Sequence, residues 1–142
     1  MNPHTDSRLG QTVADMAEKI NDPAKRPVQV ISEARARQAA EMCQTGLARA
    51  YAAALEASIW PVRYMRNAAS LSAQDQLKLA ESGIAVIGAG GLGGHIAAVA
   101  ARTGIGKITI ADPDAFAESN LNRQAMCFSE TLGKNKAEAA KS

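Results

Sequence analysis

The chain has 142 residues, of which 46% are hydrophobic and 4% aromatic, and its formal net charge of +2 lies wholly after residue 60. This length predicts one modest aliphatic core, and the near balance of charge gives no case for nucleic-acid binding. Two cysteines without a CxxC spacing exclude a disulfide scaffold and a metal site of their own, and the lack of an apolar leader or a membrane-length segment favours a cytoplasmic protein.

Residues 1–60 are expected to form a helical N-terminal extension. Residues 1–30 are polar and rich in proline, so one short helix around 11–20 and otherwise loop are predicted. Residues 31–58 are rich in helix-forming residues and contain no proline, which predicts a long helix that ends at Trp60 and Pro61. Its predicted apolar stripe comprises Ala40, Cys43, Leu47, Tyr51 and Leu55. This extension is interpreted as an appendage or an oligomerisation element.

Residues 61–142 are expected to form a partial Rossmann-like domain in an α/β chain. Ser72 and Asp75 form a capping box for a helix over 73–81. Gly83 is expected to cap the end of this helix with a left-handed backbone conformation. A strand at 84–88, a helix at 92–102 and a strand at 108–111 then predict a βαβ unit. A short helix at 120–126 and a last helix from near Gly133 follow. Because two parallel strands rarely suffice alone, the unit is expected to be C-terminally incomplete.

The glycine turn GAGGLGG follows the first of these strands directly. Gly88, Gly90 and Gly93 match G-x-G-x-x-G, the pattern in which backbone N–H groups and a helix N-terminus face a phosphate. Asp112 lies 24 residues after Gly88, at the end of the next strand, where its carboxylate could accept hydrogen bonds from ribose hydroxyls. This combination predicts a nucleotide site, but it does not separate NAD from ATP.

The stretches SNLNRQ at 119–124 and GKNK at 133–136 favour ATP. If Ser119 caps a short helix, Asn120, Arg123 and Gln124 share one polar face, with Leu121, Ala125 and Phe128 on the apolar face. Lys134 and Lys136 are expected in the first turn of the last helix, where cations oppose the helix dipole unless an anion binds there. Cleavage of a triphosphate requires such groups to hold the phosphates and to neutralise the leaving pyrophosphate.

Together these motifs resemble the ThiF/HesA/MoeB family, whose relatives are the ubiquitin-activating enzymes. The resemblance rests on GAGGLGG, on D-x-D-x-x-x-x-S-N-L-N-R-Q, on GKNK and on RYMRN at 63–67, and it covers residues 63–142. It implies an adenylyltransferase. The C-terminal carboxylate of a small ubiquitin-like or sulfur-carrier protein would attack the α-phosphate of ATP, form an acyl-adenylate and release pyrophosphate. The pathway, whether thiamine, molybdopterin, cysteine or tRNA modification, stays open.

The resemblance also implies roles for individual residues. It places the nucleotide among Gly88, Gly90, Gly91, Gly93, Asp112, Asn120, Arg123, Gln124 and Lys136. The residues implied to be catalytic are Arg123, Lys136 and Arg66, of which Arg66 would reach into the site of a partner subunit in a homodimer.

Several family features have no counterpart in these 142 residues. The magnesium-binding aspartate of the family lies beyond the last unit present, as do the carrier-binding loops and the CxxC pairs that bind zinc in some members. Mg²⁺ is therefore implied with ATP, and zinc only for a longer chain. No nucleic acid is expected as a partner, although some members act on tRNA, and no membrane is expected.

Two alternative functions stay open from the sequence. One is an NAD-dependent oxidoreductase domain, which would use the same glycines and Asp112 but leaves SNLNRQ unexplained. The other is a non-catalytic interaction domain of the same fold that binds a partner through the helix at 31–58. Cys43, His95, Asp114 and Cys127 are interpreted as packing, surface or turn residues.

Overall fold

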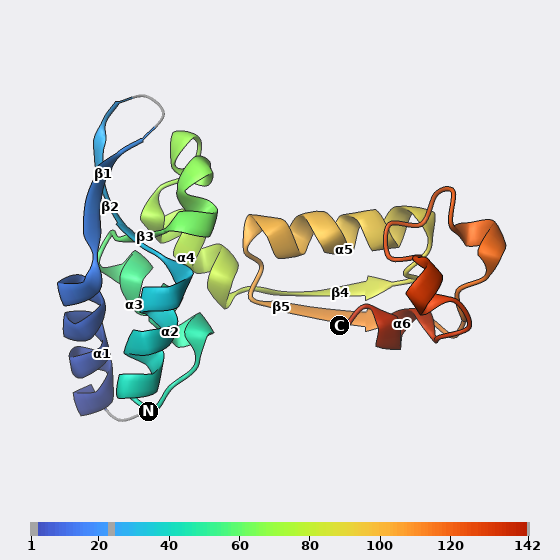
Figure 1. Ribbon diagram of the computed structural model, residues 1–142, viewed down its shortest axis with the longest axis horizontal. Helices are drawn as coiled ribbons and strands as arrows, with labels where there is room; N and C mark the ends of the chain where they lie inside the picture. Colours follow the sequence, from blue (N-terminus) through green and yellow to red (C-terminus); the bar gives the residue numbers. More distant parts are fainter. Residues whose placement is uncertain (1–2, 23–24, 142) are drawn as a thin grey trace. The chain divides into compact units, whose positions relative to one another are not determined.

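The computed structural model describes residues 3–22 and 25–141 and divides the chain into two compact units, up to Glu81 and from Ser82 onward (Figure 1). The first unit contains α1 (Pro3–Met16), β1 (Glu18–Asn21), β2 (Pro27–Ile31), α2 (Glu33–Met42), α3 (Leu47–Glu56), β3 (Trp60–Pro61), the 3-10 helix η1 (Val62–Ala69) and α4 (Ala73–Glu81). The second contains β4 (Gly83–Ile87), α5 (Gly91–Thr103), β5 (Lys107–Ala111), the 3-10 helices η2 (Glu118–Asn120) and η3 (Ser129–Thr131), and α6 (Lys136–Ala139).

The first unit is a small mixed sheet packed with helices around α3. Strand β1 pairs antiparallel with β2, and β2 pairs parallel with β3. The expectation of helices and loops alone was therefore wrong for residues 18–31 and 60–61. The β-branched residues Val28, Val30 and Ile31 favour a strand, but Pro27 was read as a loop signal. At the first position of a strand a proline is tolerated.

The predicted long helix over 31–58 is two helices joined by a tight turn. Helix α2 ends at Met42, the N–H of Thr45 donates to the carbonyl of Ala40 (2.8 Å), and Gln44 has φ +52°. Gly46 then caps the start of α3. Helix propensity summed over the segment missed this break, because the turn is only four residues long. The apolar stripe is nevertheless largely buried, with Ala40, Cys43, Tyr51 and Leu55 in the core.

Helix α4 packs against α3, which places residues 62–81 with the first unit. Its capping box is confirmed, because the Ser72 hydroxyl accepts from the N–H of Asp75 (3.1 Å) and the Asp75 carboxylate accepts from the N–H of Ser72 (3.3 Å). The predicted domain boundary at residue 60 was based on where the family motifs begin. It stays a prediction that the nucleotide-binding residues lie after residue 60.

The second unit is the predicted Rossmann-like βαβ unit. Strands β4 and β5 pair in parallel from Gly83↔Lys107 to Ile87↔Ala111, and α5 lies alongside them, connecting the end of one to the start of the other (Figure 1). Gly83 begins β4 and has no left-handed backbone, so its predicted cap was wrong. None of the helices in the described ranges has the length and apolar content that a bilayer crossing requires.

The segment after β5 contains less helix than predicted. In place of a helix over 120–126 there is the 3-10 helix η2 followed by turns, and α6 begins at Lys136 rather than near Gly133. Residues 114–116 and 133–136 run side by side instead. The N–H of Phe116 donates to the carbonyl of Lys134 (3.0 Å), and the N–H of Lys136 donates to the carbonyl of Asp114 (2.9 Å). Backbone pairing between distant segments thus replaces local helix.

Candidate nucleotide-binding site

Two glycines of the turn are required by the fold itself. Gly88 has φ +89°, a left-handed backbone that disfavours any residue with a Cβ. A Cβ on Gly93 would lie 1.7 Å from the carbonyl oxygen of Gly88, so α5 could not approach β4 this closely with a side chain there. Both glycines therefore shape the turn.

Gly90 and Gly91 have no such requirement. A Cβ on Gly91 would meet nothing within 4 Å, and one on Gly90 would meet only the Gln124 side chain, at 3.9 Å. Helix α5 begins at Gly91, and no side chain in the described part of the chain caps it. Its first-turn N–H groups therefore have no side-chain acceptor in the described residues, which suits an anion such as a phosphate.

Asp112 binds the glycine turn from the end of β5. Its Oδ2 accepts from the N–H of Ala89 (2.6 Å), and its Oδ1 accepts from the N–H of Asp114 (2.8 Å). Burial acts to raise the pKa of this carboxyl, but these two N–H donors and the positive charge of Lys136 outweigh it and hold the pKa below the ordinary aspartate value. Each carboxylate oxygen keeps a second lone pair, so Asp112 can still accept from a ribose hydroxyl.

Gln124 is a buried polar residue next to the glycine turn. Only 8% of it is exposed, and its Oε1 has no hydrogen-bond partner. Its Nε2 lies next to Gly90, as the contact with a Cβ built there shows. A buried amide oxygen without a partner costs free energy on the order of 1–3 kcal/mol, so it indicates a group that completes the site. The residues present thus fit a nucleotide at this turn.

Arg123 and Gln124 do not share a polar face as predicted, because Arg123 is exposed and Gln124 is buried. The Asn120 Oδ1 accepts from the N–H of Ala117 (3.1 Å), which fixes η2. The exposed Arg123 donates from Nη1 to the carbonyl of Ser119 (2.7 Å) and to Oδ1 of Asn122 (3.0 Å). Because turns replace the helix, Gln124 faces inward and Arg123 outward.

The predicted apolar face of that helix is also absent. Leu121 is 40% exposed and Phe128 is 57% exposed, whereas Phe116 and Cys127 are buried. The Cys127 thiol donates to the carbonyl of Ala117 (3.8 Å), which agrees with a packing role, and Cys43 is likewise buried. The prediction spaced the buried residues as in an α-helix. It chose the wrong residues, because the backbone over 121–126 forms turns.

Lys136 is buried at 6% exposure, and its Nζ forms an ion pair with Oδ2 of the exposed Asp114 (3.1 Å). Lys134 precedes α6 and is exposed. The argument from the helix dipole therefore does not hold, since α6 has only four residues and a carboxylate already neutralises Lys136. Asp114, which was interpreted as a turn residue, is the ion-pair partner of Lys136, a contact that the sequence reasoning missed.

Asn135 was missed as well. Its side chain caps α6 and reaches back to the carbonyl oxygens of Asp112 and Asp114. The available signal was an asparagine directly before a helix, a common N-cap pattern, although the predicted start of that helix near Gly133 concealed it.

Arg66 lies in η1 of the first unit and is exposed. The other predicted site residues lie in the second unit, where the turn brings the glycines, Asp112 and Gln124 together. In the described residues, no group of three or more potential metal ligands lies close enough to hold an ion.

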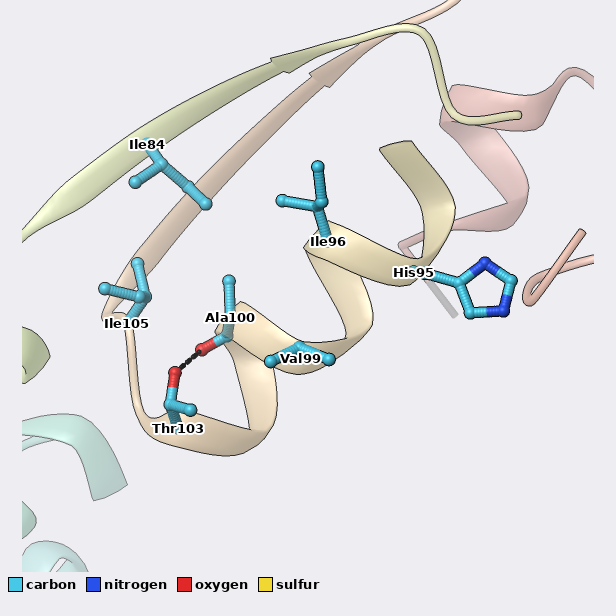
Figure 2. Close-up of a pocket in the computed structure, with 7 residues that line it drawn as sticks. All are labelled: Ile84, His95, Ile96, Val99, Ala100, Thr103 and Ile105. Carbon is cyan, nitrogen blue, oxygen red and sulfur yellow. Dashed lines mark hydrogen bonds between the residues drawn. The ribbon is translucent and has the colours of Figure 1, made fainter. Parts of the chain in front are cut away.

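A separate apolar pocket of about 460 Å³, largely open to solvent, lies beside α5 and β4 and is lined by Ile84, His95, Ile96, Val99, Ala100, Thr103 and Ile105. Figure 2 shows the isoleucine side chains of β4, of α5 and of the turn before β5 projecting into this space. None of the predicted site residues lines it, and its apolar walls do not suit a phosphate.

Comparison with known proteins agrees with these motifs. Over 65 residues the chain is 45% identical to the adenylyltransferase and sulfurtransferase UBA4 of Candida albicans. The matched segment covers 46% of this chain and 15% of that protein. The ATP complex of the E. coli tRNA N6-threonylcarbamoyladenosine dehydratase TcdA has a TM-score of 0.54 at 35% identity, covering 56% of this chain and 32% of that one. E. coli MccB with AMPCPP and MccA has a TM-score of 0.52 at 34% identity, covering 56% and 26%.

The chain therefore spans a minor part of the length of the curated relatives it matches. The model of the ThiF family matches residues 64–142, which is more than half of the chain and includes the glycine turn, Asp112, the SNLNRQ stretch and Lys136. On this match, the chain belongs to the ThiF family.

Proposed function

We propose that this chain carries the ATP-binding part of an adenylyltransferase that activates the C-terminal carboxylate of a small ubiquitin-like or sulfur-carrier protein. The observation that carries the proposal is the buried Gln124 amide, whose Oε1 has no partner and whose Nε2 lies next to Gly90 of the uncapped glycine turn. The names of the UBA4 relative and of the ATP complex of TcdA support the choice of ATP and of adenylyl transfer.

In this proposal the first-turn N–H groups of α5 bind phosphate, and Asp112 accepts from the ribose while it holds Ala89 in place. Asn120, Arg123, Gln124 and Lys136 would contribute to the phosphate site, with Arg123 turning toward it from its exposed position. A carrier carboxylate oxygen bonds to the α-phosphorus, the bond from that phosphorus to the bridging oxygen breaks, and pyrophosphate leaves. No general base is needed, because the attacking carboxylate is ionised at neutral pH.

Catalysis by these residues would rest on charge and position. Arg123 and Lys136 are the proposed cations for the departing pyrophosphate. The exposed guanidinium can turn from Ser119 and Asn122 toward phosphate oxygens, and Lys136 would exchange its ion pair with the exposed Asp114 for the phosphate. Mg²⁺ belongs to the proposal as the companion of ATP, but the described residues offer no ligand cluster for it and no step is assigned to it. Homodimerisation, with Arg66 serving a partner's site, is part of the same proposal.

The experiment for ATP against NAD is a calorimetric titration of this chain with Mg-ATP and, separately, with NAD. Saturable binding of Mg-ATP and no heat with NAD is expected. Binding of NAD in preference to ATP would replace the proposal with the oxidoreductase alternative, which the same glycines and Asp112 would serve.

The catalytic assignment is tested in the longer protein that carries this segment. We expect Arg123→Ala and Lys136→Ala each to reduce ATP–pyrophosphate exchange by about 100-fold or more, the scale for a lost group that stabilises transition-state charge. The matched control is Lys141→Ala, an exposed lysine after α6. Near-normal exchange in both test variants would show that the site is wrongly assigned.

A further inference from the structure

One side chain connects the two loops of the site. Asn135 donates from Nδ2 to the carbonyl oxygens of Asp112 (3.1 Å) and Asp114 (3.3 Å), and its Oδ1 accepts from the N–H groups of Ala137 (3.0 Å) and Glu138 (3.1 Å). Both ends of the amide are thus used. The orientation is fixed, because a reversed amide would set its oxygen against two carbonyl oxygens.

These contacts join the end of β5 to the start of α6. The segment before Lys136 already pairs with the segment after Asp112 through backbone hydrogen bonds, including one from the N–H of Lys136 to the carbonyl of Asp114 (2.9 Å). Asn135 adds the side-chain link at the point where the chain turns into the helix. The Nζ of Lys136 then lies 3.1 Å from the Asp114 carboxylate, although Lys136 itself is 6% exposed.

We infer that Asn135 is a positioning residue that holds Lys136 and the Asp112–Asp114 loop in register for nucleotide binding. This inference rests on the proposed function for the consequence at the nucleotide, but the positioning itself is a property of the chain. Burial of a lysine costs side-chain entropy and solvation, so its location must be enforced by its surroundings. The Asn135 amide acts on both backbone segments that enforce it.

The capping role and the positioning role can be separated by substitution. Asp and Ser both cap helices about as well as Asn, so Asn135→Asp and Asn135→Ser preserve the start of α6. Neither side chain can supply the two N–H donors that face the carbonyl oxygens of Asp112 and Asp114. Asn135→Ser removes these donors without adding a charge. Asn21→Asp is the matched control, because Asn21 is exposed on β1 of the first unit.

The first readout is the acetylation rate of individual lysines in the full 142-residue chain, measured by mass spectrometry with acetic anhydride. In the unaltered chain, Lys136 is expected to react about ten-fold more slowly than the exposed Lys134, because reaction requires local opening. In Asn135→Asp and Asn135→Ser the two rates are expected to agree within about three-fold, while Asn21→Asp leaves the ratio unchanged. An unchanged ratio in both Asn135 variants would overturn the inference. These variants keep the helix cap and lose only the two donors, so the donors would then have no role in holding Lys136.

The second readout separates this inference from the proposed function. Mg-ATP affinity of the same variants is expected to fall about ten-fold in step with the exposure of Lys136. If Lys136 becomes reactive while ATP affinity is unchanged, the positioning role stands and the assignment of Lys136 to the nucleotide is wrong. If Lys136 stays protected while ATP affinity falls, the positioning role is wrong.

Discussion

At the scale of single residues, the glycine turn separates into positions required by the fold and positions left open. Gly93 faces the carbonyl oxygen of Gly88 so closely that a Cβ would come within 1.7 Å, whereas Gly91 faces open space. The family resemblance places both glycines beside the nucleotide without distinguishing them. Their different surroundings give them different expected responses to the same substitution.

We expect Gly93→Ala to lower the free energy of unfolding by about 3 kcal/mol or more, because backbone must move to admit the methyl group. Gly91→Ala is the matched variant. It should leave stability unchanged or raise it by up to about 1 kcal/mol, since alanine favours helix, while it weakens Mg-ATP binding at the turn. Chemical denaturation of both variants measures the first effect and calorimetry the second. Equal stability loss in the two would contradict the packing argument.

The Asp112 carboxylate predicts a pH dependence. Its pKa in the folded chain is lowered by the Ala89 and Asp114 N–H donors and by Lys136, against the opposing effect of burial. The stabilisation is therefore fully present above the ordinary aspartate pKa of about 3.9 and is lost as the pH falls through the lower folded value.

The stability gap between the unaltered chain and Asp112→Asn should accordingly narrow below about pH 4. Urea unfolding at several pH values measures this gap, and an NMR titration of the Asp112 carboxyl carbon gives its midpoint directly. Glu118→Gln, at an exposed position, is the control for removal of a carboxylate. A midpoint at or above the ordinary value would contradict the hydrogen bonds as the cause.

At the scale of elements, the ends of α2 and α3 share a feature that the sequence hides. After α3, Ser58 has φ +57°, and the N–H of Ile59 donates to the carbonyl of Ala54 (2.8 Å). Gln44 occupies the same left-handed position after α2. Both helices thus end in the motif that glycine usually completes, with a non-glycine residue in the strained position.

Ser58→Gly is expected to raise the free energy of unfolding by up to about 1 kcal/mol, because glycine adopts this backbone without a Cβ penalty. Ser70→Gly is the control, since Ser70 has φ −127° at the end of η1 and gains nothing from glycine. Thermal unfolding followed by circular dichroism measures both. A larger gain at residue 70 than at residue 58 would show that backbone strain is not the cause.

At the scale of the whole molecule, the two units differ in how much apolar surface each buries. The first unit contains two clusters of buried residues, which together include most of α3. The second has a two-stranded sheet with Ile87 83% exposed and Val99 of α5 60% exposed. Two strands with so little cover give limited protection against local opening.

Amide hydrogen exchange should therefore be faster in β4 and β5 than in α3 at neutral pH. We expect a difference of about ten-fold or more, because a strand with an exposed face opens locally while α3 opens with its whole core. Exchange measured by mass spectrometry on peptides from 47–56 and 83–87 checks this. Equal protection of the two peptides would mean that the second unit is covered in solution.

Local pattern alone determined the βαβ unit, the glycine turn, the position of Asp112 and the helix over 73–81. Each depends on neighbours in the sequence, such as a capping box or an apolar run bounded by glycines. The strands β1 and β2 were not predicted, because Pro27 was interpreted as a loop signal. The break in the helix predicted over 31–58 was not predicted either, because a turn of four residues barely changes the helix propensity of the whole segment.

Only the tertiary structure decided the inner arrangement of the site. The ion pair between Lys136 and Asp114 and the contacts of Asn135 join residues that are distant in the sequence. The burial of Gln124 likewise depends on the packing of the loops around it. No periodicity encodes such contacts, since they arise where backbone segments pair across some twenty positions. The sequence by itself thus determined the fold class and the glycine turn, and the packing of two loops decided which side chains lie beside that turn.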